Sequence, residues 1–135
     1  MTNYLAFRLG QQTFIIEAAL ILGIAPLQEL LPRPGSLPFV CGLTFWAERA
    51  VPVIDLQVKL GLHDSPKAAR PLVMIVHAGP ARFGIVVDRV YSVLKIDESS
   101  FRDGAVRVHG RLKRRLSVRD LLSEQEAQAL EPVSL

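Results

Sequence analysis

The chain has 135 residues, with 16 Lys and Arg against 13 Asp and Glu, and a formal net charge of +3. Half of the residues are hydrophobic, which excludes an intrinsically disordered chain, and the length suits one domain that needs no disulfide or metal to fold. The single cysteine, Cys41, excludes an intramolecular disulfide and a cysteine-based zinc cluster.

The first third of the chain predicts short strands with irregular connections. Residues 4–9 and 14–16 are apolar, flank a polar turn and predict a β-hairpin. Residues 17–20 fit one helical turn, and Pro26 argues against a helix through the apolar segment that follows. The prolines between residues 32 and 38 predict a connector on the surface.

Residues 39–56 form the densest apolar segment, and two apolar runs flank Glu48-Arg49, which predicts a second hairpin with its tip there. Because proline cannot donate to a ladder, the strand that holds Pro52 must be at an edge or bulged at that point. Asp55 is predicted to cap a short helix that stops at Gly61.

The second half continues with short apolar runs and turns. We expect strands at 72–76, 83–87 and 90–96, a polar loop at 97–104, a basic stretch from 107, and a terminal helix at 120–130. Ser117-x-x-Asp120 and Ser123-x-x-Glu126 both fit the capping box. Seven to nine short strands with two or three short helices are typical of a β-barrel or sandwich.

No residue pattern builds an active site, so we expect no enzyme, no cofactor and no metal. Cys41 is predicted to be a small buried hydrophobe. The three histidines lack metal-ligand spacing, and we expect solvated or capped side chains at His63, His77 and His109. Asp55 and Asp88 each follow a β-branched run and could act as paired acids, but capping a helix start and a turn is the favoured interpretation.

The positive charge is confined to one stretch. Residues 107–119 contain six Lys and Arg and no acid, so the remaining ten bases and 13 acids leave the rest of the chain at −3. Three interpretations stay open: a solvated strand pair, a patch for an acidic protein partner, or a nucleic-acid site. Base stacking would need interleaved aromatics, and residues 102–135 contain none.

Five segments, in order along the chain, resemble the CheW-like family of bacterial chemosensory adaptors. Val51–Leu56 (V-P-V-I-D-L) is close to the family's I-V-P-I-V-D-L-R and is the most specific match. The other four are Tyr4–Gly10, Phe14–Glu17, Phe39–Thr44 and Gly84–Leu94. The resemblance covers about residues 3 to 123.

The resemblance implies a mainly β fold of two small SH3-like β-barrel subdomains, packed on a shared hydrophobic seam, with short helices. Residues 1–135 would form a single domain, with the chain passing from one half-barrel to the other near residues 62–72. It also implies a non-catalytic adaptor that couples a CheA-type histidine kinase to methyl-accepting chemoreceptor tips. The alternative is a small β-barrel that binds nucleic acid through residues 107–119.

The expected location is the cytoplasm, with receptor arrays reached through protein partners. The first ten residues lack the continuous apolar stretch of a secretory signal. The longest apolar candidate, residues 18–27, contains a proline and is about half the length of a membrane span, so we expect no direct membrane insertion.

Two departures from the family indicate an altered partner surface. Ala47 occupies the family's arginine position, and Leu22-Gly23-Ile24 occupies the place of V-Q-E-I with its glutamate, so both members of a possible charge pair are absent. Trp46 would supply an aromatic anchor instead. Residues 101–116 are shortened and basic, which suggests a second barrel that lacks a strand or closes differently. The predicted partner-binding residues are Phe45, Trp46, Ala47, Glu48, Val51, Pro52, Arg111, Arg114 and Arg115.

Overall fold

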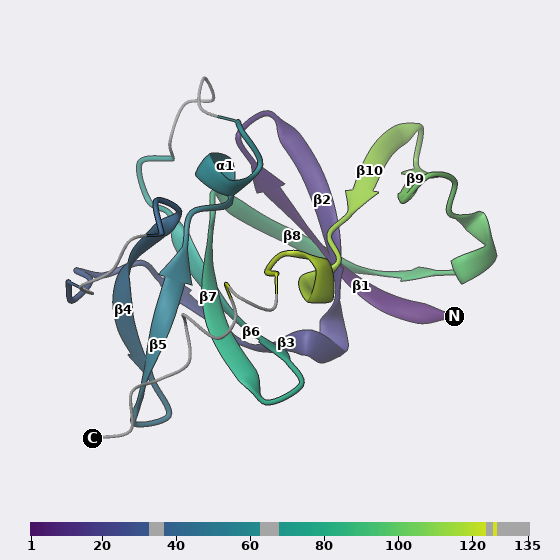
Figure 1. The fold of residues 1–135 in the computed structure, drawn as a ribbon. Coiled ribbons are helices and arrows are strands. Elements are labelled where there is room, and N and C mark those ends of the chain that lie inside the picture. Colours follow the sequence, from purple (N-terminus) through teal and green to yellow (C-terminus); the bar gives the residue numbers. More distant parts are fainter. Residues whose placement is uncertain (33–36, 63–67, 124–125, 127–135) are drawn as a thin grey trace.

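Two five-stranded sheets form the body of the protein (Figure 1). The computed structural model describes residues 1–32, 37–62, 68–123 and 126. The first sheet has the order β8 (Arg89–Ile96), β1 (Thr2–Leu9), β2 (Gln12–Glu17), β10 (Arg111–Arg115), β9 (Ala105–Val108). The second has the order β3 (Ile21–Pro26), β6 (Leu72–Ala78), β7 (Ala81–Val87), β5 (Arg49–Ile54), β4 (Val40–Trp46). The predicted mainly β fold is confirmed.

The chain crosses between the sheets at two places. It leaves the first sheet after β2, through the 3₁₀ turn η1 (Ala18–Leu20), and returns between β7 and β8. Residues 62–72, where we expected the exchange, instead lie between α1 (Leu56–Lys59), which directly follows β5, and β6 of the same sheet. Residues 63–67 of this segment lie outside the described residues. The reason is long-range pairing, because β1 and β8 are antiparallel neighbours and draw both ends of the chain into one sheet.

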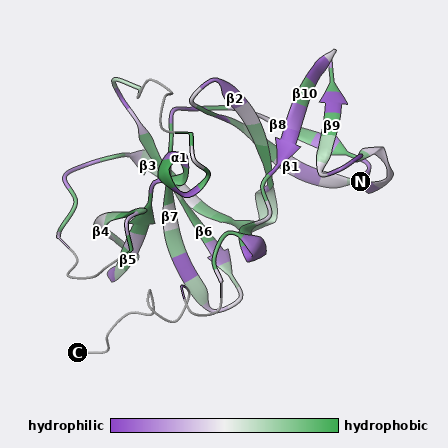
Figure 2. Ribbon diagram, turned by 45° about the horizontal axis from the view of Figure 1, so that its top comes forward, coloured by the Kyte–Doolittle hydropathy of each residue, from purple (hydrophilic) through white to green (hydrophobic). Residues whose placement is uncertain are grey.

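A central apolar cluster, which we call the seam, joins the two sheets. In β1, Leu5 and Phe7 belong to the seam. Tyr4 and Ala6 belong to a second, smaller cluster on the other face of the first sheet. All four side chains are at most 7% exposed. Strands buried on both faces read as continuous apolar runs, and Figure 2 shows hydrophobic residues along the strands that meet here.

The second sheet repeats this arrangement. In β6, Met74 and Val76 reach the seam, while Val73 and Ile75 enter a third cluster inside the second sheet. Gly84 in β7 is required there, because a Cβ at this position would lie 2.8 Å from Cγ2 of Val73. The shared hydrophobic seam is therefore flanked by one smaller core in each sheet.

The place of Pro52 in β5 follows from the hydrogen bonding of its neighbour. Pro52 lies opposite Leu43, whose N–H and carbonyl both bond to Leu31 on the far side of β4. Pro52 nitrogen therefore points away from β4, toward the side where pairing with β7 begins only at Val53. The strand is an edge at this point, as predicted, and no ladder bond is lost.

The predicted cap of α1 is confirmed. The Asp55 carboxylate accepts hydrogen bonds from the N–H groups of Gln57 (2.9 Å) and Val58 (3.4 Å). The helix stops at Gly61, which has a φ of +72°, and Leu62 N–H returns to the carbonyl of Gln57. This is a Schellman ending, so both termini of the short helix are satisfied locally.

Two further 3₁₀ turns complete the fold. η2 (Glu98–Ser100) lies between β8 and β9, and η3 (Val118–Asp120) follows β10. The Ser123 and Glu126 capping box forms reciprocally, whereas Ser117 makes no side-chain cap bond. Most of the predicted helix at 120–130 lies outside the described residues. Within the described residues, no helix is long and apolar enough to cross a membrane.

Replacing Asp55 with alanine removes the acceptor that holds the first turn of α1. We expect Asp55→Ala to lower the free energy of unfolding by about 1 kcal/mol, as cap removals do. Asp55→Asn, which keeps an accepting oxygen, should recover most of the loss. Urea unfolding measures both, with Glu29→Ala in an exposed irregular segment as the control. Equal midpoints for Asp55→Ala and the unchanged protein would contradict the assigned role.

Candidate functional site

The predicted partner-binding residues fall into two groups at opposite ends of the molecule (Figure 1). Residues 45–52 lie on the β4–β5 hairpin of the second sheet. Arg111, Arg114 and Arg115 lie on β10 of the first sheet. The fold does not bring the two groups together, so each is a separate candidate surface.

The tip of the β4–β5 hairpin is a two-residue turn at Ala47 and Glu48, one position before the predicted tip. Their φ angles are +49° and +63°, the left-handed region that this turn type requires. Left-handed backbone costs residues with a Cβ roughly 1–2 kcal/mol each, and neither position is glycine. The contacts of the flanking strands must therefore hold the tip.

Trp46 supplies the main contact of this kind. An ideal Cβ built on Gly23 of β3 would lie 2.1 Å from Cη2 and 2.3 Å from Cζ2 of the indole. The ring thus occupies the space where any other residue at position 23 would place its side chain. Trp46 is half-buried and packs against the core cluster of the second sheet. It is mainly a core residue, and Phe45, at 63% exposed, is the aromatic that this hairpin presents to solvent.

Val51 and Pro52 are buried and are not accessible to a partner. Val51 is 2% exposed and belongs to the core of the second sheet, and Pro52 is also buried. Both residues serve the core of the second sheet and are left out of the candidate surface.

Sequence reasoning missed the exposed apolar residues of β3. Leu22 and Ile24 flank Gly23 and are 39% and 38% exposed. Since side chains alternate along a strand and Gly23 faces Trp46, these two point to the outer surface. Phe45 likewise alternates with Trp46. We name Leu22, Ile24 and Phe45 the hairpin patch. The available signal was the alternation of β3 around Gly23, but apolar strand residues are ordinarily assigned to a core.

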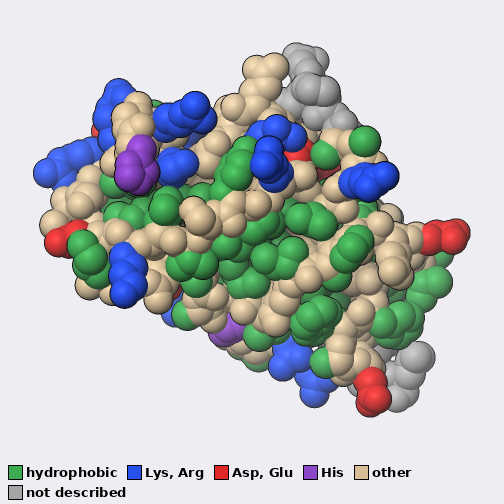
Figure 3. Space-filling model, turned by 180° about the vertical axis from the view of Figure 1, so that it is seen from behind, with side chains coloured by type: hydrophobic (Ala, Val, Ile, Leu, Met, Phe, Trp, Pro, Cys, Tyr) green, Lys and Arg blue, Asp and Glu red, His purple; other side chains and the backbone are tan. Residues whose placement is uncertain are grey.

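A second exposed apolar pair lies on β8, the end strand of the first sheet. Tyr91 is 41% exposed and Val93 is 56% exposed. We name these two residues the edge patch. Figure 3 shows apolar side chains gathered across the face turned away from the viewer in Figure 1, with Lys and Arg toward its margins. Contiguous exposed apolar surface marks interaction sites, so the hairpin patch and the edge patch are candidate interaction surfaces.

Of the three predicted arginines, Arg111 and Arg114 are exposed, whereas Arg115 is half-buried and makes contacts within the fold. Arg115 Nη1 donates to Glu98 Oε2 at 2.8 Å, and its guanidinium lies 4.2 Å from the ring centroid of Phe101. Glu98 Oε1 accepts a hydrogen bond from the hydroxyl of Tyr4. This network fastens η2 and β10 to β1.

The same network shifts the pKa values of its members. Burial, and then the hydrogen bond to Glu98, raise the pKa of the Tyr4 hydroxyl. The hydrogen bond from Tyr4, and to a smaller extent the charge of Arg115, hold the pKa of the Glu98 carboxyl below its ordinary value. Glu98 is therefore stabilised in its charged form.

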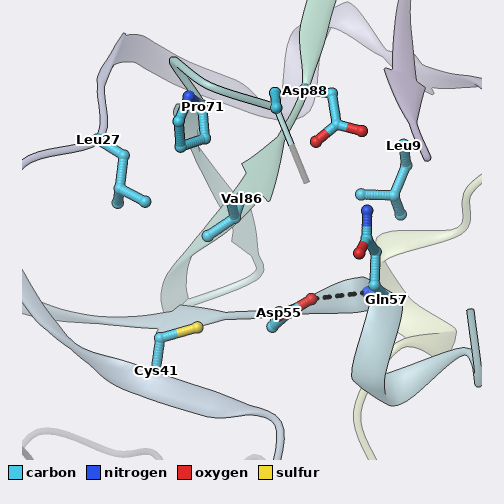
Figure 4. Close-up of a pocket in the computed structure, with 9 residues that line it drawn as sticks. Leu9, Leu27, Cys41, Asp55, Gln57, Pro71, Val86 and Asp88 are labelled. Atoms are coloured by element: carbon cyan, nitrogen blue, oxygen red, sulfur yellow. Dashed lines mark hydrogen bonds between the residues drawn. The ribbon is translucent and has the colours of Figure 1, made fainter. Parts of the chain in front are cut away.

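Asp55 and Asp88 come together at one pocket of about 150 Å³, which Cys41 also lines (Figure 4). They meet because β5 and β7 run parallel and each aspartate follows its strand. Both carboxylates bind backbone: Asp55 caps α1, and Asp88 accepts from the N–H of Gly10 at 2.6 Å. The favoured structural interpretation of both residues is thus confirmed.

The prediction that Cys41 is buried was wrong. Cys41 is exposed and lies where the β4–β5 register shifts between Val40 and Gly42, with its side chain lining the open pocket that Asp55 and Asp88 share. Among the described residues, no group of three or more His, Cys, Asp and Glu side chains could hold a metal ion. His63 lies outside the described residues, and His77 Nε2 is 3.4 Å from the carbonyl oxygen of Ala19.

Comparison with known proteins matches residues 3–125 to the CheW-like domain. The chain is 21% identical to the chemotaxis protein CheW of Rhizobium meliloti and 23% identical to the probable chemotaxis protein CheW of Rhizobium etli, covering 93% of this chain and 90% of each relative. The crystal structure of the scaffolding protein TtCheW from Thermoanaerobacter tengcongensis superposes with a TM-score of 0.81 at 19% identity, covering 90% of this chain and 88% of that one. The two sheets are accordingly the two SH3-like subdomains that the sequence predicted.

The contact between Gly23 and Trp46 predicts a strong coupling between the two positions. Gly23→Ala should overpack the site and lower the free energy of unfolding by about 1–3 kcal/mol. Trp46→Leu should also lower the free energy of unfolding. The loss caused by Trp46→Leu should be smaller in the Gly23→Ala background than in the unchanged protein. Urea unfolding of the four chains measures the coupling, and the emission of the single tryptophan reports displacement of the ring. Additive effects would contradict the contact.

The Tyr4–Glu98–Arg115 network predicts a pH-dependent contribution to stability. Because the folded pKa of Glu98 is lowered, its contribution is present above its unfolded value, ordinarily 4.5, and is lost as the pH falls through the folded pKa. We expect Glu98→Gln to flatten the decline of stability in this acidic range. Tyr4→Phe removes the hydrogen bond that lowers the pKa of Glu98, so the decline should end at a higher pH. Thermal unfolding as a function of pH tests this. Parallel profiles for Glu98→Gln and the unchanged protein would exclude the network as the cause.

Proposed function

The chain belongs to the CheW-like domain family, and from this premise we propose that it is a non-catalytic adaptor that couples a CheA-type histidine kinase to chemoreceptors in a bacterial chemosensory pathway. The observation that carries the proposal is the exposure of apolar side chains on end strands of both sheets. The relatives are chemotaxis proteins by name, and the structural neighbour is a scaffolding protein.

Coupling requires one chain to hold two partners, and the exposed apolar groups suit this task. The hairpin patch belongs to the second sheet and the edge patch to the first. Burial of such side chains against a partner gains roughly 25 cal/mol for each Å² of apolar surface, without any reacting group. Partner association, rather than chemistry, is the function that these surfaces support.

The hairpin patch supports an altered partner preference. The family's arginine position is Ala47, and Gly23 lies in the segment that carries the family's glutamate, so the packing of Trp46 on Gly23 replaces a possible charge pair. Leu22 and Ile24 flank Gly23 in sequence, Phe45 precedes Trp46, and all three side chains are exposed. A receptor or kinase that binds here would present a complementary apolar surface, because leaving a buried charge without a partner is costly.

The remaining expectations agree with an adaptor. The two aspartates of the pocket bind backbone N–H groups, so their carboxylates serve the fold. We propose a cytoplasmic location, with association to receptor arrays through the protein partners and without membrane insertion or a cofactor. Neither the family match nor the relatives support the alternative of a nucleic-acid-binding barrel.

Binding to the kinase regulatory domain and to the cytoplasmic tip of a chemoreceptor, both from the same genome as this chain, tests the proposal. We expect saturable binding to both and a ternary complex. Phe45→Asp should weaken at least one of the two interactions by tenfold or more, since exposed aromatics commonly dominate interfaces.

Leu60→Asp is the matched control, because Leu60 is 42% exposed at the end of α1 and lies outside both patches. It should bind both partners as the unchanged protein does. Failure of the unchanged chain to bind any such kinase or receptor of its own genome would refute the proposed function. Equal loss in both variants would refute the assignment of the hairpin patch.

A further inference from the structure

The β9–β10 hairpin carries positive charge that the described residues do not neutralise. It forms one end of the molecule in Figures 1 and 2, and Lys and Arg side chains gather at that end in Figure 3. Arg107, Arg111 and Arg114 are exposed and Lys113 is half-buried. None of these four has an ion-pair partner among the described residues, in contrast to Arg115, which pairs with Glu98.

The register of the hairpin sorts these residues into two faces. Val106, opposite Lys113, is buried in the core of the first sheet, so this row of residues faces inward. Arg107 lies opposite Leu112, and Arg114 is two residues beyond Leu112 on the same side. We name Arg107, Leu112 and Arg114 the basic face. Leu112 is 60% exposed, so an apolar side chain stands between two arginines in solvent.

We infer that the basic face is a docking surface for an acidic segment of a partner protein, one that carries an apolar residue between carboxylates. Two guanidinium groups match carboxylates in charge and hydrogen-bonding geometry, and Leu112 matches the apolar residue. Arg107 Nη1 lies 3.4 Å from the carbonyl of Gly110, within its own hairpin, which leaves its charge without a counter-charge. The inference does not depend on the proposed coupling role, because it uses no residue of the hairpin patch or the edge patch.

Two observations favour a protein segment over nucleic acid. The hairpin contains no aromatic side chain on which a base could stack, and the exposed leucine would face a polar phosphate backbone. The backbone also limits the mode of docking, because Arg102 exchanges two hydrogen bonds with Ala105 and closes the outer edge of β9 there. A partner strand therefore cannot pair with β9 at Ala105, and we expect docking on the side chains of the basic face.

Binding of three labelled probes to the full chain at low salt tests the inference. The probes are a Glu-rich peptide with a central leucine, poly-L-glutamate, and a single-stranded DNA oligonucleotide. We expect the leucine-containing peptide to bind most tightly, with an affinity that falls as salt rises. Arg107→Glu with Arg114→Glu should weaken this binding by more than tenfold, and Leu112→Ser should remove the preference for this peptide over poly-L-glutamate.

The control reverses two exposed arginines of the second sheet, Arg49→Glu and Arg82→Glu, which changes the net charge equally. It should retain at least half of the affinity. Circular dichroism establishes that each variant is folded, and Arg107→Gln with Arg114→Gln replaces any that is not. Tighter binding of the DNA, equal losses in the control, or no binding of any probe by the unchanged chain would each overturn the inference.

Discussion

Burial of the central strands on both faces is the constraint on which the rest of the molecule depends. β1 and β2 share the first sheet, β6 and β7 share the second, and each contributes alternate side chains to the seam and to a core of its own sheet. The middle of a strand in this position can expose neither face. The surfaces available for recognition are therefore those of the end strands and the hairpins.

At the end strands, packing in the core positions residues on the surface. Trp46 points inward onto Gly23, and this contact places β3 beside β4 at the hairpin tip. The tip itself has Ala47 and Glu48 in left-handed conformations that their side chains disfavour. Packing beneath the hairpin thus determines the position of Phe45.

The basic stretch shows that neighbouring residues of one charge can have different roles. Arg115 is fastened between Glu98 and Phe101, and it secures the last strand to the first sheet. Arg114, its neighbour, points to the opposite side of the strand and is exposed. The alternation of a β-strand assigns these roles, so the charge of a segment alone does not reveal how much of it a partner can reach.

Local signals sufficed for much of the fold. Proline and glycine positions, β-branched runs and the Asp55 cap act within a few residues, and the predicted hairpins and short helix followed from them. The ordered motifs from Tyr4 to Leu94 were enough to indicate the family, which the match to residues 3–125 established.

Contacts between distant residues decided the rest. The two crossings between sheets, the inward Trp46 and the exposed Cys41 depend on which strands become neighbours and on a register shift in β4. A pattern of alternation defines two faces of a strand but does not say which one the rest of the chain covers. The sequence by itself determined most of the elements and indicated the family, but not β3, β9 and β10 as strands. Only the tertiary structure decided which apolar and basic side chains remain exposed, because burial is a property of the assembled sheets.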